Sequence, residues 1–126
     1  MNKVVHFEVP AEDMARAKKF YEDVFGWQLM DWESKYWMAT TGPSEPGKGP
    51  TESGFINGGI APQMPDVFTA PTIVMDVENI EAAVARVEAA GGSLVTPKYP
   101  IGEMGFYARV KDSEGNIVGI WETIVK

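Results

Sequence analysis

The feature that most constrains the fold is an internal duplication. The two halves of the chain align without a gap at an offset of 66 residues, and apolar positions then coincide with apolar positions. The pairs in this alignment include Glu12 with Glu78, Met14 with Ile80, Ala17 with Ala83, Tyr21 with Val87, and Gly26 with Gly92. We therefore predict a single domain of 126 residues built from two similar modules, module one at about residues 1–62 and module two at about residues 70–126.

Each module reads as a strand, a helix and three further strands. In module one, residues 3–9 are rich in β-branched and aromatic types, and the helical apolar spacing that follows ends at Gly26. Strands are predicted at residues 27–32, 35–40 and 55–62, with a turn at Glu33 and Ser34. In module two the strand of residues 71–77 precedes a helix that ends at Gly91 and Gly92, and strands follow at 93–96, 105–111 and 116–125. The predicted class is α+β, with the helices covering one face of the sheet.

Residues 42–54 contain four glycines, three prolines and almost no apolar side chain. We predict a mobile loop here, which serves either as a lid or as a linker between strands.

Composition limits the classes of function. The net charge of −7 disfavours nucleic acid as a partner, and the lack of cysteine excludes disulfides and thiolate metal ligands. The sequence shows no apolar run that could span a membrane and no secretory leader, so we expect a cytoplasmic protein that binds no membrane.

Alternation along the strands divides their side chains between two faces. His6 and Glu8 are predicted to point away from the helices, as are Thr72 and Asp76. With residues 112–115 as a four-residue hairpin loop, Tyr107 lies opposite Ile120 and Arg109 opposite Val118, and Glu122 joins them on the face away from the helices. A bulge at Gly115 would reverse one strand of this assignment.

Four stretches of the chain form a recognisable series: the first strand with His6, the FYEDVFGW run from Phe20 to Trp27, the helix that ends in AAGGSLV, and DSEGNIVGIWE from Asp112 to Glu122. In this order and spacing they resemble the vicinal oxygen chelate superfamily, which includes glyoxalase I, bleomycin-resistance proteins and extradiol dioxygenases, although Ser113 replaces a proline that is common there. The resemblance implies two βαβββ modules whose mixed sheet curls into a cup with the helices outside.

The resemblance also implies where a divalent metal would bind. His6 matches the first ligand position and Glu122 matches the last. Thr72 occupies another ligand position, and residues 55–63 contain neither carboxylate nor imidazole. Half of the expected ligand set is therefore absent, and we do not expect tight metal binding unless Glu8 or Asp76 completes an altered site.

Three functions follow as hypotheses. The first is a protein of the bleomycin-resistance type that binds a small aromatic or oxygen-rich molecule, with the cup walls drawn from Trp32, Trp37, Phe55, Thr72, Tyr107 and Arg109. The second is a divergent lyase, isomerase or dioxygenase in which Glu122 is the general base, His6 an acid or orienting group and Arg109 an anion clamp. The third is an interaction module with an empty cup. A homodimer is expected from the resemblance.

Overall fold

The structure, a computed structural model, describes residues 1–124 and divides the chain into two compact units. One unit comprises Val5–Pro71, and the other joins Met1–Val4 to the chain from Thr72 onward. Residue 125, the predicted end of the last strand, lies outside the described residues. Neither of the two helices within residues 1–124 is long and apolar enough to cross a membrane.

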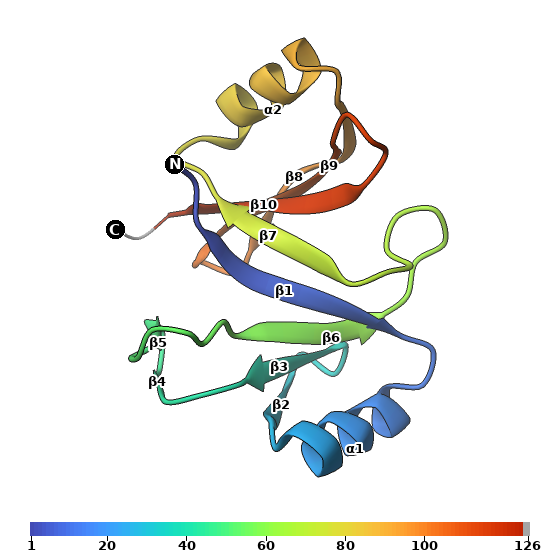
Figure 1. The fold of residues 1–126 in the computed structure, drawn as a ribbon, viewed down its shortest axis with the longest axis vertical. Helices are drawn as coiled ribbons and strands as arrows, with labels where there is room; N and C mark the ends of the chain where they lie inside the picture. The colour runs from blue at the N-terminus through green and yellow to red at the C-terminus, as the bar shows by residue number, and fades with distance from the viewer. Residues whose placement is uncertain (125–126) are drawn as a thin grey trace. The chain divides into compact units, whose positions relative to one another are not determined.

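The first unit contains one helix and a four-stranded mixed sheet (Figure 1). Its elements are β1 (Val4–Ala11), α1 (Met14–Phe25), β2 (Gln28–Trp32), β3 (Tyr36–Thr40) and β6 (Gly58–Pro62). The strands lie in the order β2-β3-β6-β1, with β1 parallel to β6 and the other neighbours antiparallel. These elements agree with the predicted strand–helix–three-strand module.

Local signals in the sequence explain where α1 begins and ends. Asp13 precedes the helix in an extended conformation, and its Oδ1 accepts a hydrogen bond from the backbone N–H of Arg16 at 3.0 Å. Gly26 follows the helix with φ of 68°, which is the left-handed conformation that glycine adopts at low cost. The predicted helix end at Gly26 is confirmed. So is the turn at Glu33 and Ser34, whose φ angles of 55° and 60° reverse the chain between β2 and β3.

The predicted loop of residues 42–54 lies between β3 and β6. It contains a short hairpin of β4 (Ser44–Glu45) and β5 (Gly49–Pro50). The hairpin is tied back by Asn57, whose Nδ2 donates to Ser44 Oγ at 2.9 Å while its Oδ1 accepts from the backbone N–H of Thr41. These hydrogen bonds connect the hairpin to the chain beside it, although the segment has no apolar core of its own.

The second unit repeats the first in both element order and strand order. Its elements are β7 (Thr72–Asp76), α2 (Ile80–Ala89), β8 (Ser93–Ile101), β9 (Gly105–Lys111) and β10 (Ile117–Thr123), and its strands lie in the order β7-β10-β9-β8. The first strand is again parallel to the last. The α+β class and the two βαβββ modules are confirmed.

The core of the second unit lies between α2 and one face of its sheet. It consists of Val77, Ile80, Ala83, Ala108, Val110 and Ile120, with Val84, Val87, Phe106 and Val118 packed against them. This face therefore carries the even-numbered residues of β9, as predicted, and it also carries the even-numbered residues of β10.

The register of the β9–β10 hairpin differs from the register that a four-residue loop predicts. Arg109 lies opposite Gly119 and Tyr107 opposite Trp121, one position away from the predicted partners. The cause is Gly115, which adopts φ of 86°, together with the Asp112 side chain, whose Oδ1 accepts from the backbone N–H groups of Glu114 and Asn116. The bulge at Gly115 is therefore present, and it reverses the predicted faces of β10.

Candidate functional site

The first unit presents a histidine–tyrosine pair on the sheet face away from α1. His6 Nε2 and the Tyr36 hydroxyl lie 2.8 Å apart, and the two rings are nearly parallel, at 11°. The next residues along the two strands, Phe7 and Trp37, point to the opposite face. Phe7 packs against Trp27 at 5.2 Å, and Trp37 packs against α1. The structure thus gives the chain's one histidine a specific hydrogen-bond partner, which sequence reasoning did not identify.

Burial changes the proton affinity of His6. Desolvation lowers the pKa of His6 below its ordinary value of 6.5, and the nearby negative charge of Glu8 opposes the change without cancelling it. The imidazole is therefore neutral at pH 7, with one ring nitrogen able to donate and the other able to accept. Glu8 itself is buried, with 7% of its surface exposed.

A glycine makes room for the Tyr36 ring. A Cβ built on Gly59 would lie 1.8 Å from the Tyr36 hydroxyl oxygen, so the ring rests directly on the β6 backbone. Trp32 stands opposite Tyr36 in the β2–β3 ladder and meets its ring edge-on, at 6.3 Å between centroids. His6, Tyr36 and Trp32 form a group that we call the aromatic platform.

Two predicted wall residues of the first unit lie elsewhere. Trp37 lies on the helix side of the sheet, where its Nε1 donates to the backbone oxygen of Met14 at 3.0 Å and Lys18 Nζ sits 5.5 Å from its ring. Phe55 lies against Gly42, beside the β4–β5 hairpin, and is 37% exposed. The structure brings neither of them to the aromatic platform.

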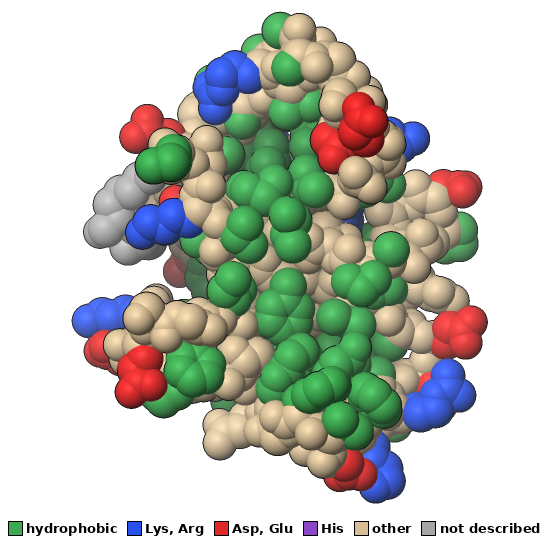
Figure 2. All heavy atoms as spheres, in the orientation of Figure 1, with side chains coloured by type: hydrophobic (Ala, Val, Ile, Leu, Met, Phe, Trp, Pro, Cys, Tyr) green, Lys and Arg blue, Asp and Glu red, His purple; other side chains and the backbone are tan. Residues whose placement is uncertain are grey.

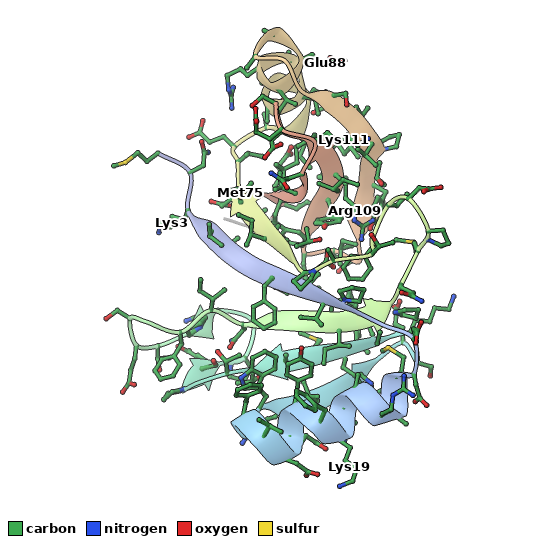
Figure 3. The ribbon with its side chains drawn as sticks, turned by 45° about the vertical axis from the view of Figure 1, so that its right-hand side comes forward. Lys3, Lys19, Met75, Glu88, Arg109 and Lys111 are labelled. Atoms are coloured by element: carbon green, nitrogen blue, oxygen red, sulfur yellow. The ribbon has the colours of Figure 1, made fainter. Side chains whose placement is uncertain are left out.

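In the second unit, Tyr107 and Arg109 share the sheet face away from α2, as predicted. Both are buried, and the guanidinium carbon of Arg109, which is labelled in Figure 3, lies 5.0 Å from the centre of the Tyr107 ring. Tyr99 meets Tyr107 edge-on at 5.8 Å. Thr72 is also buried, at the start of β7. This face therefore holds a buried aromatic ring next to a buried guanidinium group.

Glu122 lies on the opposite face, among the groups around α2. Its Oε1 accepts a hydrogen bond of 2.8 Å from the backbone N–H of Ile80, the first residue of α2. Lys98 Nζ lies 3.6 Å from the same oxygen and also pairs with Glu81. The prediction that Glu122 faces away from the helices was wrong, because the hairpin register is shifted by one residue. The carboxylate holds the N-terminus of α2 against the sheet, where the positive end of the helix dipole favours a negative charge.

The donor set does not fit a divalent metal. On the face away from α2, β10 presents Gly119 and Trp121, neither of which can ligate such an ion. Within residues 1–124, no group of three or more histidine, aspartate or glutamate side chains lies close enough together to hold one. Neither Glu8 nor Asp76 completes an altered set there, and we derive no chemistry through a metal.

Comparison with known proteins places the chain in a family. Residues 3–120 match the model of the Glyoxalase/Bleomycin resistance protein/Dioxygenase superfamily. The chain belongs to this superfamily. The predicted resemblance is confirmed.

The curated proteins that match the chain are longer than it is. Two proteins named "Putative glyoxylase CFP32", from Mycobacterium bovis and Mycobacterium tuberculosis, are each 28% identical over 123 residues, covering 91% of this chain and 43% of the relative. The chain therefore spans less than half the length of these curated relatives.

Solved structures share the fold at low sequence identity. A superfamily member from Vibrio splendidus 12B01 has a TM-score of 0.63 at 16% identity, covering 98% of this chain and all of that one. A variant of Streptomyces coelicolor methylmalonyl-CoA epimerase, in complex with 2-nitronate-propionyl-CoA, has a TM-score of 0.65 at 12% identity, covering 99% and 96%. At these identities the likeness concerns the fold alone.

The alternation of side chains along β3 is the sequence signal that points to Tyr36. Tyr36 and Trp37 are neighbours in one strand, so they must point to opposite faces. The prediction that Trp37 lines the cup implies that Tyr36 points to the helix side. In the structure Tyr36 lies on the face of His6, and Trp37 lies on the helix side.

Proposed function

We propose that this superfamily member binds a small aromatic, oxygen-bearing molecule without using a divalent metal. The observation that carries the proposal is the aromatic platform, in which the neutral His6 imidazole and the Tyr36 hydroxyl are 2.8 Å apart on the sheet face away from α1. An aromatic ligand can stack on these rings, and its oxygens can exchange hydrogen bonds with the imidazole and the hydroxyl.

Glu122 has no part in the proposal, because its carboxylate is bound to the N-terminus of α2. A lyase or isomerase mechanism with Glu122 as the general base therefore has no support from the geometry.

The test is a fluorescence titration with catechol, whose ring carries two adjacent oxygens. We expect catechol to quench the fluorescence of Trp32, which stands at the platform, in protein treated with a chelator. The Tyr36→Leu variant should lose the quenching. The matched control is Trp37→Phe, since Trp37 lies on the helix side of the same sheet and its replacement should leave catechol binding intact.

Metal analysis of the same preparations distinguishes the alternatives. Stoichiometric metal in the purified protein, lost in His6→Ala, would overturn the metal-free proposal. Quenching that persists in Tyr36→Leu would show that catechol binds away from the platform.

A further inference from the structure

The sheet face that carries the aromatic platform also carries two exposed methionines. Met30 of β2 and Met38 of β3 are direct partners in the antiparallel ladder, two positions along the strands from the pair of Trp32 and Tyr36. Because side chains alternate along a strand, both methionines point to the same face as Trp32 and Tyr36. Met30 and Met38 are 70% and 43% exposed. The methionines therefore extend the aromatic platform into a larger apolar surface.

This face of the β2–β3 ladder carries no charged side chain within residues 28–32 and 36–40. Its remaining pair, Gln28 with Thr40, is uncharged. Asp31, the one charged residue in these two strands, points to the helix side with its partner Trp37. The surface of α1 differs, since Figure 2 shows hydrophobic side chains gathered along this helix with acidic and basic side chains beside them. A ligand that extends over β2 and β3 on the platform side therefore meets no ionic group of these strands.

The hydrogen-bonding groups of the platform lie at the other end of this surface. His6 belongs to β1, and β6 and β3 separate β1 from β2. The Tyr36 hydroxyl lies above Gly59 of β6, at 2.8 Å from His6 Nε2. Since neighbouring strands are about 4.8 Å apart, the three spacings from β1 to β2 amount to about 14 Å. A ring whose oxygens bond to His6 and Tyr36 lies over β1 and β6, and only a substituent on that ring extends over β3 and β2.

Methionine is suited to contact with such a substituent. Residues directly opposite in an antiparallel ladder have Cβ atoms about 5 Å apart, so the side chains of Met30 and Met38 form one patch. A methionine side chain is unbranched and flexible, and it adapts to apolar groups of different shape. When a ligand covers this patch, apolar surface of both partners is removed from water, and this stabilises the complex.

We propose that the ligand of this site is an aromatic molecule whose oxygen-bearing ring carries an uncharged, apolar substituent, with the ring at the aromatic platform and the substituent on Met30 and Met38. This class of ligand rests on the function proposed above and narrows it. The two methionines are then the residues that determine specificity. His6 and Tyr36 bind the oxygens that all such ligands share.

Fluorescence titrations with catechol and 4-tert-butylcatechol test the proposal in protein treated with a chelator. The two probes carry the same oxygens and differ only in the apolar group, and Trp32 at the platform reports the binding of both. Each methylene that is buried increases affinity about fourfold, so 4-tert-butylcatechol should bind at least about tenfold more tightly than catechol.

Variants of Met38 identify the contact. Met38→Gln keeps the length of the side chain but makes it polar, so it should reduce the ratio of the two affinities to less than about threefold. Met38→Leu keeps an apolar side chain and should retain the ratio. The matched control is Met64→Gln, because Met64 is a 40% exposed methionine of the same unit that lies outside β2 and β3. Circular dichroism verifies that each variant keeps its fold.

The function proposed above and this class of ligand fail in different ways. If catechol does not bind, or binds equally well to Tyr36→Leu, the proposed function is wrong and the class of ligand falls with it. If catechol binds at the platform and 4-tert-butylcatechol binds no more tightly, only the class of ligand is overturned. It is also overturned if Met38→Gln retains the tenfold ratio, or if Met64→Gln loses it.

Discussion

Replacing Glu122 by alanine tests the role that the structure gives to this residue. The Glu122 carboxylate accepts the backbone N–H of Ile80 at 2.8 Å, next to Lys98, and only 15% of the side chain is exposed. If the carboxylate fastens the N-terminus of α2 to the sheet, its removal must lower the stability of the protein. If it were a catalytic base or a metal ligand, its removal would lower activity and leave stability nearly unchanged.

The expected magnitude follows from the contacts that are lost. A hydrogen bond to a charged group contributes about 1.5–3 kcal/mol, and the truncation also leaves the Ile80 N–H without this acceptor. We expect Glu122→Ala to lower the free energy of unfolding by about 2 kcal/mol. For a chain of this length that corresponds to a decrease in Tm of about 8 °C. Glu122→Gln keeps an acceptor oxygen but loses the charge, so it should cost about half as much.

Urea unfolding followed by circular dichroism measures these free energies. Glu103→Ala is the matched control, because Glu103 is an exposed glutamate in the same unit. A surface substitution of this kind changes stability by about 0.5 kcal/mol or less. The reasoning fails if Glu122→Ala destabilises the protein no more than Glu103→Ala does.

Three further predictions concern other contacts of the chain. Gly59→Ala should displace Tyr36 and destabilise the protein by about 1–3 kcal/mol in urea unfolding, since its Cβ would lie 1.8 Å from the hydroxyl; an unchanged midpoint would contradict this contact. Burial lowers the pKa of His6, so the unfolded chain binds a proton that the folded chain resists, and stability should fall as pH decreases below about 6.5; His6→Gln should lack this slope in unfolding measured from pH 7 to 5. Hydrogen bonds from Asn116 hold the pKa of Asp112 below its ordinary value of 3.8, so their stabilisation is present above that pH and is lost below it; Asp112→Ala should lower Tm at pH 7 and show a weaker loss of stability in acid than the wild type.

The duplicated pattern allowed much of the fold to be predicted from the sequence. Helix ends depend on local signals, such as the left-handed conformation at Gly26, and these act within a few residues. Strand and helix periods likewise depend only on neighbouring positions. For this reason the two βαβββ modules, and the position of His6 on the face away from α1, could be predicted from the sequence.

The candidate site depended on contacts that the sequence does not display. The pairing of His6 with Tyr36 joins residues 30 positions apart and requires the space above Gly59. Trp37 was assigned to the wrong face because either of two adjacent aromatic residues could have faced the platform. Only the packing of Trp37 on α1 decides between them.

The sequence by itself determined the class of fold, the repeated module and the position of His6 on the face away from the helix. The tertiary structure decided where Glu122 points. One residue in the left-handed conformation, Gly115, shifts the β9–β10 register by one position. Because successive side chains of a strand point to opposite faces, that shift moves the carboxylate from the face of the predicted metal site to the N-terminus of α2.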